Sequence, residues 1–120
     1  MSVVKLAIVG SRSFTDAAAF EAIIDAWIAA HGVPDTIVTG DATGVDAMAR
    51  AYATEHGLAL SVHKAQWNVA ERAAGPLRNA EIVRECTAML ALPSNTGRGT
   101  QNAIKQALKA GIKPEIHFVQ

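Results

Sequence analysis

Three apolar runs in this chain each break into a polar loop that carries glycine, and a helix-like segment follows each loop. The runs cover residues 5–9, 36–39 and 87–92, and their loops cover residues 10–12, 40–44 and 93–100. A helix N-terminus presents unpaired N–H groups and the positive end of the helix dipole, and glycine lets an anion come close to that backbone. If the strands are parallel, all three loops lie on one edge of the sheet, where open α/β sheets bind ligands.

Strands that alternate with helices of about ten to fifteen residues predict right-handed βαβ units and a parallel sheet. We expect an α/β fold, a three-layer Rossmann-like sandwich with a five-stranded sheet, formed as a single domain over residues 1–120. The preferred strand order, 3-2-1-4-5, puts the switch point between the first and fourth strands. The expected strands are 3–9, 36–39, 58–63, 87–92 and 114–119, and the expected helices are 15–31, 43–56, 76–86 and 99–110.

Composition and charge narrow the classes of function. The chain has 120 residues, a formal net charge of zero and a pI near 6.9, which argues against a dedicated duplex-DNA binder, because such proteins carry a basic face. Cys86 is the only cysteine, so we expect no intramolecular disulfide and no cysteine-based metal site, and a reducing cytoplasmic location fits best. Residues 1–9 are too short an apolar run for a signal peptide or a membrane span.

The sharpest local signal is the run Gly97-Arg98-Gly99-Thr100 at the third junction. Two glycines and a threonine between a strand and a helix suit a phosphate cradle, since threonine adds a hydroxyl donor and Arg98 adds charge. A flexible turn that caps the helix explains the same residues equally well. The Rossmann dinucleotide fingerprint is absent after the first strand, as is the Walker A lysine, which disfavours NAD binding and ATP hydrolysis.

The second loop reads Gly40-Asp41-Ala42-Thr43-Gly44-Val45-Asp46. Thr43 and Asp46 stand three apart, as in a capping box with aspartate in place of glutamate. Asp46 could instead accept a hydrogen bond from a sugar hydroxyl, and the capping role is at least as well supported. Asp41 would repel a phosphate unless its side chain points away, and the sequence leaves its direction open.

The first loop, Gly10-Ser11-Arg12, supplies a tight turn through its glycine and a cation through its arginine. Arg12 has no obvious partner on a helix, so we favour a place for its side chain in a pocket. Trp67 lies in the most irregular connection of the chain. It could stack on a nucleobase, although covering the core is the commoner role for such a tryptophan.

Arg78-Asn79 lies near the expected start of the 76–86 helix. Arginine at a helix N-terminus opposes the helix dipole, so it needs another reason to be there. An anionic ligand is one explanation, and an ion pair with Glu81 or Asp46 is an equally good one.

The remaining features are less informative. No spacing of His, Asp and Glu suggests a metal site. His63 ends a strand and could face the crevice, and Cys86 reads as core packing. The first helix, around Phe20 and Trp27, and residues 82–90 could offer an apolar face, so we expect a homo-oligomer and no membrane contact.

Four motifs occur in order along nearly the whole chain. They are Val9-Gly10-Ser11-Arg12 with Thr15-Asp16, Thr39-Gly40-Asp41-x-x-Gly44-x-Asp46, Ala74-Gly75-Pro76-x-Arg78-Asn79, and Gly97-x-Gly99-Thr100. Together they resemble the YspA/YpsA-related branch of the SLOG superfamily, which groups Smf/DprA with the LOG phosphoribohydrolases. The resemblance implies a Rossmann-like fold that binds nucleotides or nucleotide-derived ligands, often as an oligomer.

The chain departs from the family pattern at three positions. The second family motif usually reads Gly-Gly, and here Asp41 stands at the second position. LOG enzymes carry Pro-Gly-Gly-x-Gly-Thr-x-x-Glu with a catalytic glutamate, and that position here is Ala103. Their Arg-Lys pair looks like Arg78-Asn79, so the lysine is not kept. The resemblance therefore disfavours phosphoribohydrolase chemistry by the LOG mechanism.

The preferred hypothesis is a binding or sensing module for a nucleotide or nucleotide-derived phosphorylated ligand, held in a crevice at the carboxyl ends of the strands. The expected ligand contacts come from the glycine loops and the Arg78 helix. They are Gly10, Ser11, Arg12, Gly40, Gly44, Asp46, Arg78, Asn79, Gly97, Arg98, Gly99 and Thr100.

Two other hypotheses stay open. One is a nucleotide-processing hydrolase that cleaves an N-glycosidic bond or a phosphate ester, with Asp46 or Glu81 as general acid or base. The other is a single-stranded nucleic-acid binder that combines a positive groove with stacking on Trp67. Its neutral net charge and its few aromatic residues (three Phe, two Trp, one Tyr) count against it. The arginines of such a groove would be Arg12, Arg72, Arg78 and Arg98.

Overall fold

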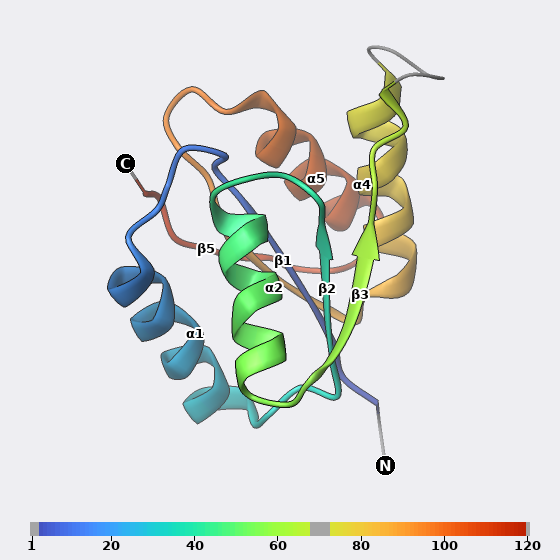
Figure 1. Ribbon diagram of the computed structural model, residues 1–120. Coiled ribbons are helices and arrows are strands. Elements are labelled where there is room, and N and C mark those ends of the chain that lie inside the picture. Colours follow the sequence, from blue (N-terminus) through green and yellow to red (C-terminus); the bar gives the residue numbers. More distant parts are fainter. Residues whose placement is uncertain (1–2, 68–72, 120) are drawn as a thin grey trace.

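The computed structural model describes residues 3–67 and 73–119 (Figure 1). Strands and helices alternate along these residues, as the periodicity predicts. In chain order the elements are β1 (Lys5–Gly10), α1 (Ala17–His31), β2 (Thr36–Gly40), α2 (Val45–Glu55), β3 (Ala59–His63), α4 (Ala74–Glu85), β4 (Ala88–Leu92), α5 (Arg98–Lys109) and β5 (Glu115–Ile116).

The five strands form one sheet in the order β3-β2-β1-β4-β5, and every neighbouring pair is parallel. This confirms the predicted Rossmann-like fold and strand order. The central strand β1 is apolar without alternation, since Leu6, Ala7 and Ile8 are all fully buried. A strand covered on both faces needs apolar side chains on both. The order reverses between β1 and β4, and the chain leaves these two strands toward opposite faces of the sheet.

Helices cover both faces of the sheet, which gives three layers (Figure 1). Alternate residues of each inner strand serve the two faces. Leu6 and Ile8 pack in the core beneath α1 and α2, together with Phe20, Ile24 and Tyr52. Their neighbours on the strands pack beneath α4 and α5 in a second core. Its members on these strands and helices include Ala7, Val9, Val38, Met89, Ile82, Ala103 and Ile104.

Helix α1 begins and ends where the sequence signals it. The Asp16 carboxylate caps its N-terminus by accepting the N–H of Ala19 at 3.0 Å. Gly32 closes the helix at φ 90°, a value that favours glycine. In the last turn His31 stacks on Trp27, and its Nδ1 lies 2.9 Å from the Trp27 carbonyl oxygen.

Several expected boundaries move by a few residues. Helix α4 begins at Ala74, before Pro76, because proline is tolerated in the first turn, where its missing N–H has no helical partner. The last strand is much shorter than predicted and ends at Ile116. Beyond it, the N–H of Val119 still donates to the Pro93 carbonyl at 2.9 Å, so the segment follows β4 without forming a regular ladder.

The expected apolar face for self-association is wrong in its residues. Phe20 and Trp27 are buried in the core, as are Ile82, Val83 and the β4 side chains around Met89. These apolar side chains recur at the spacing of core positions, and the sheet and helices bury them within the monomer. The large apolar side chains that stay exposed are Val3, Val33, Leu60, Trp67, Leu77, Leu108, Ile116 and Phe118. Across the described ranges, no helix is both long and apolar enough to cross a membrane.

Candidate functional site

A cavity of about 410 Å³ lies at the carboxyl ends of β1, β2 and β4, at the switch point of the sheet. Its walls come from the β1–α1 loop, the start of α2, the start of α4 and the β4–α5 loop. The lining residues are Val9, Gly10, Ser11, Arg12, Ser13, Ala42, Asp46, Arg78, Asn79, Ser94, Thr96, Gly97, Arg98, Gly99 and Thr100. Most of the predicted contact residues are therefore brought to one place. Gly40 and Gly44 are not in the wall.

Two glycines let the loops around this crevice approach one another. A Cβ on Gly10 would lie 2.6 Å from the Leu92 carbonyl oxygen and 2.7 Å from a methyl group of Val45, closer than real side chains come. Gly44 has φ 71° and sits against the backbone of the first loop. Hydrogen bonds then join the loops, since Val45 N–H donates to the Ser11 carbonyl and Ser11 N–H donates to the Leu92 carbonyl, both at 3.0 Å.

The N-terminus of α5 opens directly into the crevice. Gly97 is the N-cap residue, and its own N–H donates to Ser94 Oγ at 3.1 Å. Within the described residues no side chain caps this helix. The first-turn N–H groups of Arg98, Gly99 and Thr100 therefore carry the positive end of the helix dipole toward the cavity. The turn does supply the N-cap residue, as the alternative interpretation expects, but its cap comes without a side-chain hydrogen bond.

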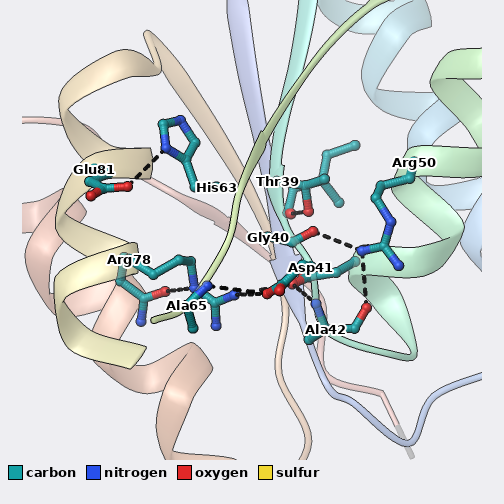
Figure 2. A network of polar contacts seen from close by, with 12 residues as sticks. Thr39, Gly40, Asp41, Ala42, Arg50, His63, Ala65, Arg78 and Glu81 are labelled. Carbon is teal, nitrogen blue, oxygen red and sulfur yellow. Dashed lines mark hydrogen bonds and ion pairs between the residues drawn. The ribbon is translucent and has the colours of Figure 1, made fainter. Parts of the chain in front are cut away.

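Arg78 reaches across from α4 to the β2–α2 loop (Figure 2). Its side chain is only 9 % exposed, and its Nη1 lies 3.4 Å from Asp41 Oδ1 and 3.9 Å from Asp46 Oδ2. Its Nε–H donates to Asn79 Oδ1 at 3.1 Å. The predicted ion pair with Asp46 is thus present, with Asp41 as a second partner, and the one with Glu81 does not form. Among the described residues, Nη2 has no hydrogen-bond partner.

Asn79 joins the arginine to the glycine loop of α5. Its Oδ1 accepts from Arg78, and its Nδ2 donates to the Gly99 carbonyl and to Asn102 Oδ1, both at 3.1 Å. The side chain is buried, its contact with Arg78 is buried as well, and its contacts with Gly99 and Asn102 are partly buried. Asparagine at this position therefore holds Arg78 and the α5 N-terminus in fixed relation, a role that the sequence did not reveal.

Asp46 forms part of the crevice wall and is buried. Burial raises its pKa above the ordinary value, while the Arg78 charge, the N–H of Ala42 and the Arg50 charge act in the opposite direction. The Ala42 N–H lies 3.3 Å from Asp46 Oδ2. This contact replaces the predicted capping box, because Thr43 turns away and donates its hydroxyl to the Arg12 carbonyl at 2.9 Å.

Arg50 fixes the loop that carries the acidic residues. Its Nη1 donates to the carbonyl oxygens of Gly40 at 2.8 Å and Ala42 at 3.0 Å (Figure 2). Sequence reasoning missed this arginine, although its position one helical turn after Asp46 was a usable signal. Asp41 turns toward Arg78 and the Ala65 N–H, and it lines a neighbouring cavity instead of the crevice. That settles which way its side chain points.

The other candidate acid lies elsewhere. Glu81 pairs with His63 at 3.2 Å on the side of α4 that faces β3, and neither residue lines the crevice (Figure 2). His63 is held from its other ring nitrogen by Glu85 at 2.6 Å. The expectation that His63 could face the crevice is therefore wrong. Ala103, at the LOG glutamate position, is buried in the core beneath α5. Arg72 lies outside the described residues.

Arg12, which lines the crevice, contacts Trp67, which lines the neighbouring cavity. The Arg12 guanidinium carbon lies 5.6 Å from the centroid of the indole ring, a cation–π contact. Trp67 is 49 % exposed, so it does not cover the core. In the described ranges, no group of three or more His, Cys, Asp or Glu side chains is arranged to hold a metal ion.

The chain has known relatives. The model of the YspA, cpYpsA-related SLOG family matches residues 4–69, which is more than half of the chain. The chain belongs to this family. It is also 36% identical over 88 residues to the Gene 61 protein of Mycobacterium phage D29, a match that covers 68% of this chain and 70% of that protein.

The fold agrees with a solved structure. The X-ray structure of DNA processing protein A (DprA) from Streptococcus pneumoniae superposes with a TM-score of 0.75 at 18% identity, over 95% of this chain. The chain spans 50% of the length of that DprA chain. At this level of identity the likeness concerns the fold.

Proposed function

We propose that the crevice binds a nucleotide or nucleotide-derived phosphorylated ligand, and that the protein acts as a binding or sensing module. One observation carries the proposal: the uncapped N-terminus of α5 and the buried guanidinium of Arg78 line the same cavity. A helix N-terminus alone is a weak anion site. Arg78 is nine-tenths buried and has no partner on Nη2 among the described residues, so it adds a second, directed hydrogen-bond donor.

The charges in the wall favour an anion at the α5 end. Asp41 and Asp46 both lie near Arg78 and compensate its charge. Arg12 and Arg98 have no carboxylate within ion-pair distance among the described residues, and both line the cavity. A phosphate beside the Gly97–Thr100 loop would therefore meet backbone N–H groups and two uncompensated arginines.

The nucleotide part of the proposal draws on Asp46 and on the family. The Asp46 carboxylate faces the cavity with one oxygen engaged by Ala42, which leaves an acceptor for a sugar hydroxyl. Asp46 lines the same cavity as the Gly97–Thr100 loop, so a ribose attached to a phosphate at that loop suits its position. Membership in a SLOG family supports the same class of ligand.

Thermal shift with a ligand panel tests the proposal. The panel contains nucleoside mono-, di- and triphosphates, cyclic nucleotides, ADP-ribose, ribose 5-phosphate and a short oligonucleotide. A ligand at 100 times its Kd should stabilise the fold by about 2.7 kcal/mol. For a chain of this size we expect a shift in Tm of several degrees. A flat response across the panel would refute the proposal, and a response to the oligonucleotide alone would favour a single-strand binder.

Two substitutions that each remove one cation from α5 test the phosphate site, one in the cavity wall and one as its control. Arg98→Ala removes a cation from the cavity wall, while Lys105→Ala removes one two turns further along the same helix, outside that wall. We expect Arg98→Ala to raise Kd by about 10-fold or more, because a charged hydrogen bond to phosphate is worth about 1.5–3 kcal/mol. Lys105→Ala should bind like the wild type.

Asp46 supports a second candidate function, a nucleotide-processing hydrolase. A buried carboxyl with a raised pKa in a ligand-sized cavity has the properties of a general acid or base. The test is chromatography of each incubation for released base or phosphate, with wild type and Asp46→Asn in parallel. Product that disappears in Asp46→Asn would establish the hydrolase. Ligand binding without release of a product would refute the hydrolase and support the binding module.

A further inference from the structure

A second cavity of about 250 Å³ adjoins the crevice on the side of β3. It is lined by Arg12, Asp41, Ala42, Thr43, Trp67 and Arg78. Three of these residues, Arg12, Ala42 and Arg78, also line the crevice. The two cavities therefore adjoin one another along Arg12, Ala42 and Arg78, so one extended ligand can contact residues of both.

The second cavity is built around an exposed indole ring. Trp67 is 49 % exposed, whereas the other tryptophan, Trp27, is 4 % exposed in the core. An edge of the Trp67 ring rests on Gly75 at the start of α4, where a Cβ would lie 3.4 Å from Cη2. Leaving half of so large an apolar ring in water forgoes much of the free energy of its burial. A ligand that covered the ring would recover it.

The groups around the ring suit a flat heteroaromatic partner. Arg12 lies over the indole at 5.6 Å, and guanidinium groups stack on nucleobases as they do on indole. The Asp41 carboxylate lies in the same wall and can accept from an N–H at the edge of a base. The backbone of Arg12 is fixed by the hydrogen bond from Thr43, so its side chain pivots from a defined point.

We infer that this second cavity is a base subsite, in which a nucleobase stacks on the exposed ring of Trp67 with the Arg12 side chain moved to its edge, while the phosphate of the same molecule lies at the N-terminus of α5. The inference rests on the proposed function and adds the ligand class: a nucleoside phosphate in preference to a sugar phosphate. Arg12 lines both cavities, so it contacts the ligand on both sides of the sugar.

The test compares nucleoside monophosphates with ribose 5-phosphate, using tryptophan fluorescence and Tm. Of the two tryptophans, only Trp67 is exposed enough to respond to a stacked base. We expect AMP, GMP, CMP or UMP to quench the emission and to bind at least about 10-fold more tightly than ribose 5-phosphate, given the usual strength of stacking on an aromatic side chain. Ribose 5-phosphate should raise Tm with little change in emission.

Substitution at the ring completes the design. Trp67→Ala should abolish the preference for nucleotides and leave ribose 5-phosphate binding unchanged, and Trp67→Phe should keep part of the preference. Leu77→Ala is the matched control, because Leu77 is a similarly exposed apolar residue on α4 that lines neither cavity. The Tm of each ligand-free variant shows that it folds.

The outcomes separate this inference from the proposed function. Equal binding of nucleotides and ribose 5-phosphate, with no effect of Trp67→Ala, would overturn the base subsite and leave the phosphate site standing. No binding of either class would overturn both. A nucleotide preference that survives Trp67→Ala would also refute the subsite, because the base would then lie elsewhere.

Discussion

The carboxylate of Asp46 lies 3.9 Å from the guanidinium of Arg78, and both side chains are more than nine-tenths buried. The two residues are far apart in sequence and come from α2 and α4. The fold places a cation and an anion together at the base of a cavity, where water screens them weakly. Each of the two buried charges is therefore neutralised in part by the other.

Removing the cation should be costly. Arg78→Ala leaves Asp46 buried without its main counter-charge, and breaking a buried pair in this way costs about 3–5 kcal/mol. Urea unfolding followed by circular dichroism measures the loss. Arg84→Ala, an exposed arginine on the same helix, should change the free energy of unfolding by no more than about 0.5 kcal/mol. Similar losses in the two variants would contradict the pairing.

The pH dependence of stability should reveal Asp46. Its pKa is raised in the folded protein, so the folded state holds this proton more tightly than the unfolded state. This tighter proton binding stabilises the folded state at low pH. The stabilisation is lost as the pH rises from 3.8, the ordinary pKa of an aspartate, through the raised pKa of Asp46 in the folded protein. Relative to Asp46→Asn, the wild type should gain stability as pH falls from neutral, by at most about 1.4 kcal/mol per pH unit. A parallel pH profile would show that this carboxyl has an ordinary pKa.

Gly40 should tolerate no side chain. A Cβ there would lie 2.6 Å from Asp46 Oδ2 and would also press on Arg78. We expect Gly40→Ala to cost about 1–3 kcal/mol, as overpacking does, and to weaken ligand binding. At Gly99 a Cβ would meet nothing within 4 Å, so Gly99→Ala should fold with wild-type or slightly greater stability. Differential scanning calorimetry of both variants checks the contrast, and equal Tm values would refute it.

The single tyrosine should titrate late. Burial raises the pKa of Tyr52 to about 12, and the hydrogen bond and charge of Asp25 at 2.9 Å add to the shift. Ultraviolet absorbance of tyrosinate reports Tyr52 alone, since the chain has one tyrosine. We expect the midpoint to fall toward 10 in Asp25→Asn. Circular dichroism on the same samples verifies folding, and a wild-type midpoint near 10 would disprove the contact.

Cys86 should be almost inert in the native protein. Burial raises the pKa of its thiol to about 11, so the thiolate fraction at pH 8 is very small. Reaction with a disulfide reagent at that pH should be at least about 100-fold slower than in denaturant. The chain has one cysteine, so the release of chromophore reports this residue alone. Rapid reaction without denaturant would mean that the C-terminus of α4 opens readily.

Much of the fold followed from local patterns. The apolar runs around Ile8 and Leu90 predicted central strands, and Asp16 and Gly32 marked the ends of α1 correctly. Parallel strands with right-handed crossovers leave few topologies, which is why the strand order was also predicted. The failures lay at Pro76 and beyond Ile116, where proline placement and edge pairing decide boundaries that periodicity does not encode.

The sequence predicted where the loops of the crevice lie better than it predicted which partners their side chains contact. Glycine loops before helices identified the crevice, because loops after parallel strands share one edge of the sheet. Side-chain partners were harder to predict. Thr43 was expected to cap α2 and instead donates a hydrogen bond to Arg12. Glu81, a candidate acid of the hydrolase hypothesis and a candidate partner of Arg78, pairs with His63. A rotation of about 100° along a helix turns a side chain from one neighbour to another, and sequence spacing does not say which neighbour is there.

Local periodicity and the handedness of crossovers were enough to predict the alternation of strands and helices, the strand order and the positions of the glycine loops. Periodicity did not predict that Arg78 pairs with Asp41 and Asp46, that Asn79 connects Arg78 to Gly99, or that Trp67 stays exposed beside Arg12. Those contacts join residues from different elements. Their geometry is set by how the helices pack on the sheet, and packing depends on all the side chains at once.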